Sequence, residues 1–277
     1  MAGTQVLQGQ TLEQNKYNQH EFSFQVSGGM SPLTFKTEVG ESSGGGGFGA
    51  GFGYTYRFNP NWGISTGVNV ATFGNKLSLD AFNGSYNTTD NQGDDFRFSY
   101  SVTNYEEKQN VTMVLIPIMA RYELPLNFNF AETDLQVAGG FKVGLPLSSK
   151  STVQQGTFSS QGYYSHENQT YQNLPHRGFV TNHTMDKAKN TLELKTAIML
   201  SLEAGLSFNL GNDLALFSGL YFDYGLNDIQ KLQDGELVQY QSENPAALQT
   251  GNALQTNMVS KIVPMSVGLK VRIGLNR

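Results

Sequence analysis

The sequence contains no cysteine, few charged residues and no long apolar run. Without cysteine there is no disulfide framework and no thiolate to bind a metal or act as a nucleophile. Charged residues make up 15% of the chain, against about 25% in an average globular protein. The net charge of −5 offers no basic surface for nucleic acid. The longest apolar run, residues 113–120, is far shorter than the ~18 residues of a membrane-spanning helix.

Alternation of apolar and polar residues takes the place of long apolar runs. This alternation predicts β-strands, because successive side chains of a strand point to opposite faces. We expect eight strands, at about residues 21–29, 46–58, 62–78, 109–126, 133–146, 191–210, 214–225 and 258–275.

The connectors between these segments are alternately long and short. They span, in order, about residues 30–45, 59–61, 79–108, 127–132, 147–190, 211–213 and 226–257. A soluble sandwich or barrel has no reason to sort its connectors in this way, whereas an outer-membrane barrel has short periplasmic turns and long extracellular loops. The sequence therefore predicts an all-β fold, an eight-stranded antiparallel up-and-down transmembrane β-barrel.

The two faces of each predicted strand differ in chemistry. In residues 192–210 nearly all even-numbered positions are apolar, while the odd-numbered positions include Glu193, Lys195 and Glu203. In residues 47–58 the even positions are mostly aromatic and the odd positions mostly glycine. Small and polar side chains suit the lumen of a narrow barrel, and large apolar side chains suit lipid. We therefore expect the apolar face to point outward.

Aromatic residues gather beside the predicted short turns. Aromatic rings favour the level of the lipid headgroups, so these residues are expected to form a girdle at one membrane interface. The alternative is that they are ordinary aromatics at strand ends. The candidates are Tyr54, Tyr56, Phe58, Trp62, Tyr122, Phe128 and Phe208.

Charged residues on the small-residue face form the best-defined polar constellation. Isolated charges in a narrow interior would cost several kcal/mol each, so we expect them to pair. Their near-balance of sign favours a salt-bridged plug over the alternative, an ion path. The predicted lumen charges are Arg57, Arg121, Glu123, Asp134, Lys142, Glu193, Lys195, Glu203, Asp223, Lys270 and Arg272.

The predicted loop at 147–190 is the longest connector and is rich in Tyr, Asn, Gln and Ser. Such a composition suits adaptable polar contacts with a protein or a glycan, although a hydrated variable surface would look similar. Its histidines are candidates for a metal site or a lipid-modifying site, but solvated histidines fit their spacing better. The binding candidates are Tyr163, Tyr164, His166, Tyr171, His176 and His183.

A family resemblance rests on the eight segments, the four long connectors and three sequence stretches. These stretches are the glycine-rich residues 44–53, the segment 115–122 and the closing segment 266–275. The chain resembles the outer-membrane β-barrel domain family common in Bacteroides-like bacteria, which includes PorT-like proteins. The resemblance covers residues 20–277 and implies the OmpA–OmpX type of architecture, although the chain ends on Leu275, Asn276 and Arg277 and not on an aromatic residue.

These observations lead to a set of expectations about organisation and function. We expect a periplasmic N-terminal lead over residues 1–20 and a barrel domain over residues 21–277, located in the bacterial outer membrane with its signal peptide removed. The expected role is structural or surface binding through the extracellular loops, with a closed lumen, no cofactor and no enzymatic activity. The expected partners are outer-membrane lipid or detergent and an extracellular protein or glycan, and the expected state is a monomer. The alternatives are a lipid-modifying enzyme that acylates or deacylates lipid A, and a soluble ligand-binding barrel.

Overall fold

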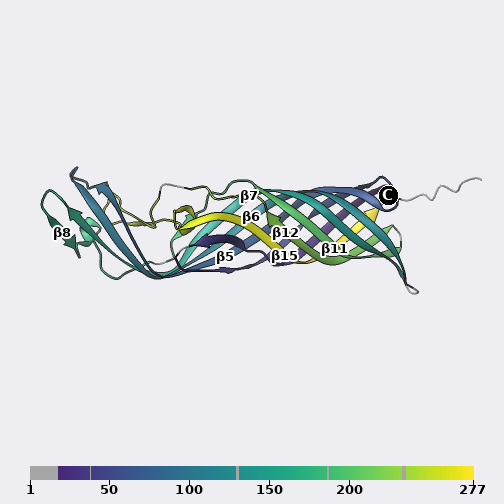
Figure 1. Ribbon diagram of the computed structural model, residues 1–277, viewed down its shortest axis with the longest axis horizontal. Helices are drawn as coiled ribbons and strands as arrows, with labels where there is room; N and C mark the ends of the chain where they lie inside the picture. The colour runs from purple at the N-terminus through teal and green to yellow at the C-terminus, as the bar shows by residue number, and fades with distance from the viewer. Residues whose placement is uncertain (1–17, 38, 129–130, 186, 212, 233–234) are drawn as a thin grey trace, which may run out of the picture.

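The computed structural model describes residues 18–37, 39–128, 131–185, 187–211, 213–232 and 235–277. The molecule is an elongated rod in which a barrel continues at one end into a narrower sheet (Figure 1). Apart from two short 3₁₀ helices, the regular structure of the described residues is β-strand. No helix in this part of the chain is long and apolar enough to cross a membrane.

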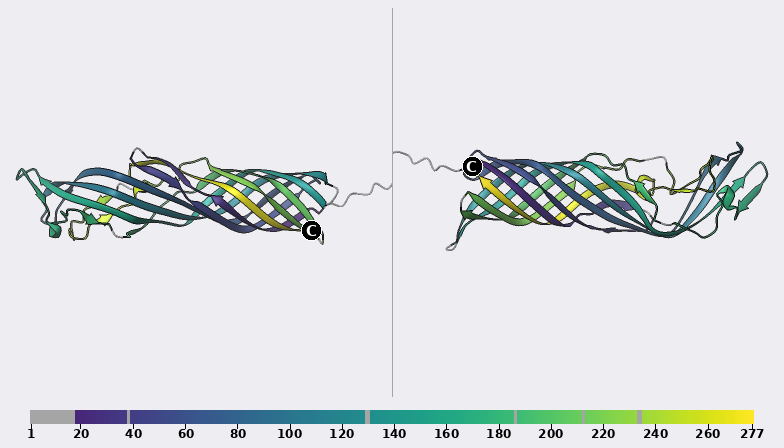
Figure 2. Two further views of the ribbon diagram at one scale, coloured as in Figure 1. Left: turned by 90° about the horizontal axis from the view of Figure 1, so that it is seen from below. Right: turned by 180° about the vertical axis from the view of Figure 1, so that it is seen from behind.

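Eight strands form the barrel, as the alternating segments predict. Neighbours in the chain pair antiparallel, and β1 pairs with both β4 and β15. The last strand therefore joins the first and the sheet closes, as the views in Figure 2 show. The barrel strands are β1 (His20–Met30), β4 (Gly46–Arg57), β5 (Trp62–Thr89), β6 (Asp95–Phe128), β7 (Ala131–Tyr164), β11 (Ala197–Gly211), β12 (Leu214–Gly225) and β15 (Val259–Asn276).

Short additional elements lie at the long-loop end, where they extend the sheet or cover its mouth. Three of them, β8, β9 and β10, pair along the outer part of β7. The additional elements are β2 (Leu33–Thr37), β3 (Glu41–Gly44), β8 (Gln169–Gln172), β9 (His183–Thr184), β10 (Lys189–Thr191), β13 (Val238–Gln239), β14 (Gln249–Thr250), η1 (Pro175–Arg177) and η2 (Ala253–Gln255).

The expected loops at 79–108 and 147–190 are wrong in large part. β5 runs to Thr89 and β6 begins at Asp95, so a tight hairpin replaces the first loop. β7 likewise continues to Tyr164. The outer parts of these three strands continue together beyond the barrel and form the narrow end of the rod. We call this part, residues 81–89, 95–103 and 157–164, the projecting sheet.

β-bulges explain why the alternation did not predict these extensions. The pairing of β6 with β7 shifts between Thr103 and Glu106, where Asn104 has a φ of 51°. A bulge inserts an extra residue and reverses which face each later side chain occupies. Tyr105 and Val111 are buried at odd positions of β6, whereas beyond the bulge the buried residues are at even positions. The alternation of apolar and polar residues therefore changes between odd and even positions at the bulge, although the strand continues.

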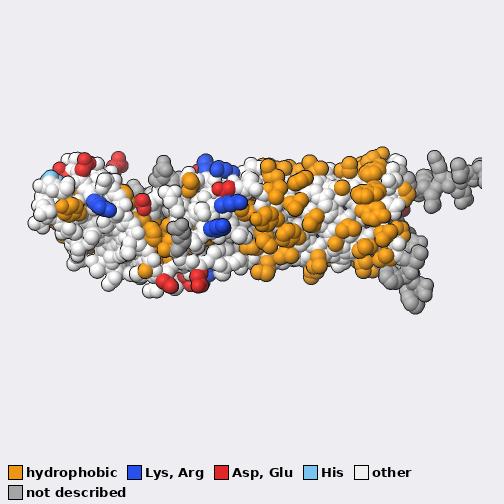
Figure 3. Space-filling model, viewed as in Figure 1, with side chains coloured by type: hydrophobic (Ala, Val, Ile, Leu, Met, Phe, Trp, Pro, Cys, Tyr) orange, Lys and Arg blue, Asp and Glu red, His pale blue; other side chains and the backbone are white. Residues whose placement is uncertain are grey.

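The outer surface of the barrel is a band of exposed apolar side chains, visible as the orange region of Figure 3. Phe52 is 70% exposed, Leu269 65% and Ile118 61%, all on outward positions. Beyond this band the arrangement reverses, and apolar side chains such as Phe73 and Met113 fill the interior. The barrel thus has a lipid-facing part with a polar lumen and an outer part with an apolar core, which we call the mouth core.

Candidate functional site

A continuous network of charged side chains fills the lumen near the short-turn end. Arg57 of β4 lies 2.5 Å from Glu21 of β1 and 3.2 Å from Glu123 of β6. Arg121 donates a hydrogen bond of 2.8 Å to the other oxygen of Glu21, and Arg272 lies 3.6 Å from that same oxygen. Glu21 therefore joins three guanidinium groups that come from three different strands.

The network continues toward the mouth through Glu203 of β11. Its carboxylate accepts a hydrogen bond of 2.6 Å from Lys270 and lies 3.8 Å from Arg272 and 3.9 Å from Lys142. Lys142 in turn donates to Asp223 at 2.8 Å. Arg57 and Glu123 are partly buried and the other charged groups of the network are buried, so each needs an opposite charge close by, and the network supplies it.

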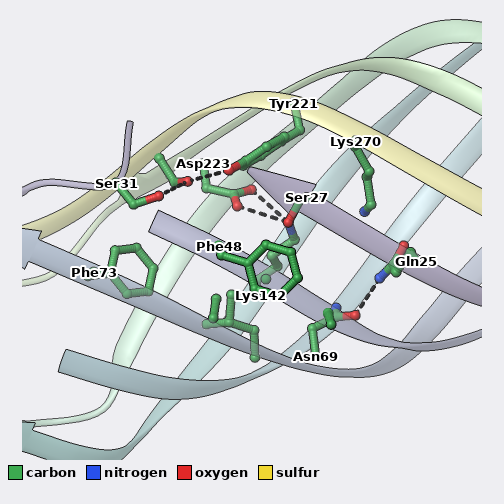
Figure 4. A pocket seen from close by; sticks show the side chains of 15 residues that line it. Gln25, Ser27, Ser31, Phe48, Asn69, Phe73, Lys142, Tyr221, Asp223 and Lys270 are labelled. Atoms are coloured by element: carbon green, nitrogen blue, oxygen red, sulfur yellow. Dashed lines mark hydrogen bonds and ion pairs between the residues drawn. The ribbon is translucent and has the colours of Figure 1, made fainter. Parts of the chain in front are cut away.

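Two water-sized voids lie between these side chains. One cavity of about 30 Å³ lies beside Lys142 and Asp223, and another of about 30 Å³ lies beside Arg272. Figure 4 shows the first cavity, where the side chain of Gln25 on β1 donates to Asn69 on β5, over Gly51 of the strand between them. Each void has room for one or two water molecules, since one water needs at least about 10–15 Å³.

The prediction of lumen charges was wrong for Glu193 and Lys195. β11 begins at Ala197, so both residues precede the barrel strand and are exposed. Glu193 pairs with Lys231 at 2.5 Å outside the barrel. Alternation continues through this segment because Leu192 packs into the mouth core, not because its neighbours face a lumen.

The other predicted lumen charges lie inside the barrel wall. Asp134 stands on β7 opposite Ser207 of β11 and is partly exposed. The remaining members belong to the network just described, namely Arg57, Arg121, Glu123, Lys142, Glu203, Asp223, Lys270 and Arg272.

The alternation pattern missed Glu21, which, like Glu203, has three cationic partners. The signal was present, because Glu21 shares its face of β1 with Ser23 and Gln25, both buried in the lumen. It also missed Glu107 at the mouth. This carboxylate accepts hydrogen bonds from the Tyr105 hydroxyl at 2.6 Å, from Ser151, and from the backbone N–H group of Ala253 at 3.0 Å.

The projecting sheet has an aromatic inner face. Phe96 of β6 stacks on Tyr164 of β7 with ring centroids 4.9 Å apart. Its ring also meets Tyr240 at 5.0 Å and Phe179 at 5.7 Å, both from segments that cover the sheet. These contacts hold the covering segments against the strands. They keep the projecting sheet folded, although it lies beyond the barrel.

The outer face of the projecting sheet is polar and hollowed. A cavity of about 480 Å³ there is lined mainly by Ser, Asn, Gln and Thr side chains, and a second cavity of about 460 Å³ adjoins Arg97 and Tyr163. The register places Ser85 opposite Ser99, and Ser99 opposite Gln161. Hydroxyl and amide groups therefore lie side by side in rows across three strands.

The three predicted loop tyrosines all have hydrogen-bond partners, and Tyr163 donates to Asn168 at 3.1 Å. Tyr164 is buried and donates a hydrogen bond of 3.0 Å to Asp90 in the hairpin turn. Burial and this hydrogen bond raise the pKa of Tyr164 above its usual range. Burial raises the pKa of Asp90 too, but hydrogen bonds from the N–H groups of Asp94 and Gln92 and from Tyr164 outweigh it and leave this pKa lowered. Tyr171 donates to Glu167 at 2.7 Å.

Of the remaining loop candidates, which are exposed, His166 joins two of these tyrosines: its ring lies 5.8 Å from that of Tyr164, which lies 5.4 Å from that of Tyr171. His166 lies 3.6 Å from Glu167, His176 belongs to η1, and the ring of His183 packs edge-on against Phe158. Among the described residues, no group of three or more His, Cys, Asp or Glu side chains is placed to hold a metal ion. Tyr163 is 39% exposed and borders the second outer cavity.

The predicted aromatic residues lie at the short-turn end of the apolar band. The rings of Trp62 and Tyr122 are 4.8 Å apart, and Tyr54 accepts or donates a 2.7 Å hydrogen bond with His20. Tyr56 and Phe58 are 42% and 48% exposed. Phe208 is partly exposed at the end of β11, and the side chain of Phe128 lies outside the described residues.

Comparison with known proteins assigns the chain to a family. The family model for the outer membrane protein beta-barrel domain matches residues 8–231. The chain therefore belongs to this family, and it is an outer-membrane β-barrel protein. A search of curated proteins found no match.

Several solved structures of outer-membrane proteins are similar to the chain. Neisserial surface protein A is 10% identical, with a TM-score of 0.34 over 92% of this chain and 95% of that one. OprG from Pseudomonas aeruginosa is 13% identical, with a TM-score of 0.35 over 93% and 95%. Ail of Yersinia pestis, solved with the heparin analogue sucrose octasulfate, is 14% identical, with a TM-score of 0.26 over 92% and 99%.

Proposed function

We propose that this barrel has a closed lumen and binds an extracellular glycan on the outer face of its projecting sheet. The observation that carries the proposal is the cavity of about 480 Å³ over β5, β6 and β7. We also propose that the protein acts as a monomer, because the barrel pairs its first strand with its last and leaves no barrel edge for a second copy. We further propose that the protein belongs to the Bacteroides-type branch of the family, because its sequence resembles barrels of that type.

The chemistry of this cavity favours a sugar over a protein. Protein interfaces depend on a few aromatic or arginine anchors in desolvated pockets, whereas this lining consists mostly of uncharged hydrogen-bonding side chains. Hydroxyl and amide groups both donate and accept hydrogen bonds, so they match a ligand that carries many hydroxyl groups. The lining of this cavity carries no charge, and that of the second outer cavity carries one charge of each sign, Asp95 and Arg97, so the site favours a glycan without net charge.

The two outer cavities also have the shape of an extended site. Successive side chains on one face of a strand are about 6.6–6.8 Å apart, and the cavities together extend from the row of Ser101 to the row of Asp95. These four rows cover on the order of 20 Å. An elongated polar site suits a chain of sugars better than a single small molecule.

A substitution that fills the larger cavity tests the proposal. Ser99→Phe places a ring on the outer face, where Ser99 lines the cavity, while Thr103→Phe adds the same ring on an exposed position of the same strand that lines neither cavity. Calorimetry of the detergent-purified protein with neutral hexasaccharides of glucose, mannose and galactose should show binding. Ser99→Phe should weaken it about tenfold or more, since each lost hydrogen bond contributes about 1 kcal/mol.

The control decides what a loss of binding means. Thr103→Phe should bind as the unchanged protein does, and both variants should keep the gel mobility shift of a folded barrel on heating. Equal loss in both variants, or binding of a protein ligand in place of every hexasaccharide, would contradict the glycan site.

A further inference from the structure

The described lysines are distributed very unevenly over the molecule. Lys142 and Lys270 lie in the lumen network. Every other described lysine lies just beyond the outer end of the apolar band, and none lies at the short-turn end. Figure 3 shows basic side chains gathered directly beside this end of the band. The lysines of this level are Lys36, Lys76, Lys108, Lys150, Lys187, Lys189, Lys195, Lys231 and Lys261.

Four of these lysines form one patch on neighbouring strands. Lys76 of β5 stands directly opposite Lys108 of β6, which stands opposite Thr152 of β7, and Thr152 pairs with Lys189 of β10. Lys150 is two residues before Thr152, on the same strand, opposite Asn110 and Thr191. We call Lys76, Lys108, Lys150 and Lys189 the lysine patch.

The patch carries more positive charge than its neighbours neutralise. Lys76 pairs with Glu106 at 2.7 Å. No salt bridge within the described part of the chain includes Lys108, Lys150 or Lys189. Like charges placed directly opposite each other on paired strands are destabilising. An anionic ligand over the patch would remove this repulsion.

The height of the patch identifies the source of that anion. Leu147, 66% exposed, is the outermost exposed side chain of the apolar band on β7, and Lys150 follows three residues later. This separation is about 10 Å along the strand, and the strand tilt reduces it to roughly 8 Å in height. The headgroup layer extends roughly 5–7 Å beyond the hydrocarbon core, and lysine side chains reach back toward it. The ammonium groups therefore lie at the level of lipid headgroups.

We propose that the lysine patch is a binding site for the phosphate groups of an outer-leaflet lipid. The ammonium groups of Lys108, Lys150 and Lys189 would contact the phosphates, because phosphate oxygens accept charge-assisted hydrogen bonds from lysine. Asn110 and Thr191 lie in the row of Lys150, one row closer to the apolar band than Lys108 and Lys189, and offer hydrogen bonds to adjacent headgroup oxygens. The apolar residues below the patch hold the acyl chains, so that one lipid contacts both surfaces.

The test compares phosphorylated and dephosphorylated lipid on the intact protein. The purified barrel in a zwitterionic detergent is titrated with diphosphoryl lipid A, with lipid A from which both phosphates have been removed, and with inorganic phosphate. Binding of the diphosphoryl lipid should be the tightest and should weaken as salt is raised. The double variant Lys108→Gln and Lys150→Gln should weaken it about 30-fold, from the usual contribution of a basic residue at an anionic surface.

Lys231→Gln provides the matched control, because Lys231 pairs with Glu193, two residues along the chain from Thr191, which stands opposite Lys150. This variant should bind the diphosphoryl lipid nearly as the unchanged protein does. Equal binding of the dephosphorylated lipid would overturn the proposal, as would equal losses in the double variant and the control. Competition by inorganic phosphate at millimolar concentration would assign the patch to free phosphate and overturn the lipid assignment.

Discussion

At the residue scale, the contrast between buried and exposed charge pairs governs stability. Glu21 is 3% exposed and contacts three arginines, whereas Glu193 is exposed and contacts one lysine. Removing one partner of a buried pair leaves an uncompensated charge in a poorly solvated interior. An exposed pair loses little, because water and salt already screen it.

Glu21→Gln should therefore destabilise the barrel by about 3–5 kcal/mol. Its three arginines would keep their charges and lose their shared carboxylate. Urea unfolding in detergent micelles, followed by the loss of the heat-dependent gel shift, measures the change in the free energy of unfolding. Glu193→Gln should change it by less than about 1 kcal/mol. Similar effects of the two substitutions would show that the network does not stabilise the lumen.

These two glutamates also show what the sequence could predict about the lumen. Alternation identified most of the inward charges, because a strand with one apolar face carries its polar residues on the other face. It wrongly included Glu193, because alternation also occurs where a segment packs across the barrel mouth. It missed Glu21, a single charge near the start of β1, although Glu21 alternates with the apolar residues of that strand in step with Ser23 and Gln25. Pairings between strands, such as Glu203 with Lys270, depend on the register and cannot be read from one strand.

At the element scale, the long strands of the projecting sheet depend on one another. Residues Phe96, Phe98 and Tyr100 of β6 are buried against the covering segments and the strands on either side. Removal of 152–186 alone would take away the outer part of β7 and expose this aromatic face. An exposed apolar face of that kind favours aggregation. The sequence-based view of 147–190 as an independent loop does not fit this arrangement.

A paired deletion should separate the barrel from the projection. Residues 80–104 and 154–186 are each replaced by Asn-Gly, which favours a tight hairpin turn. The bulge at Asn104 and the pairing of Val153 with Ala188 mark natural points at which to cut. The shortened protein should remain a folded, heat-modifiable barrel that no longer binds the hexasaccharides. Deletion of 152–186 alone should yield aggregated or protease-sensitive protein, and recovery of a fully folded barrel from it would contradict the dependence of β6 on β7.

The β-bulges set the limit of prediction at this scale. The strand boundaries within the membrane agree with the alternation to within a few residues, because the lipid and the lumen impose a strict two-residue period. Outside the membrane no lipid imposes that period, and a single inserted residue such as Asn104 changes its phase. The prediction of a loop at 79–108 therefore missed the projecting sheet, although aromatic residues alternate with polar ones at 96–100, where β6 runs.

At the scale of the whole molecule, two layers of different chemistry occupy the interior in series. The lower layer is the charged network around Glu21 and Glu203. The upper layer is the mouth core, in which Leu33, Phe73 and Met113 are almost completely buried. An ion that crossed the barrel would have to displace a salt-bridged network and then enter an apolar region, and each step carries a desolvation cost.

The intact barrel should therefore show no steady single-channel conductance in planar bilayers. Phe73→Ala and Met113→Ala together would thin the mouth core while leaving the charged network complete, so this variant should also fail to conduct. A porin inserted under the same conditions shows that the measurement detects open barrels, and recovery of the protein from the bilayer by flotation shows that it has inserted. Stepwise conductance from the unchanged protein would mean that the two layers move apart in the membrane. Conductance confined to the thinned variant would place the barrier in the mouth core and leave the charged network a stabilising role only.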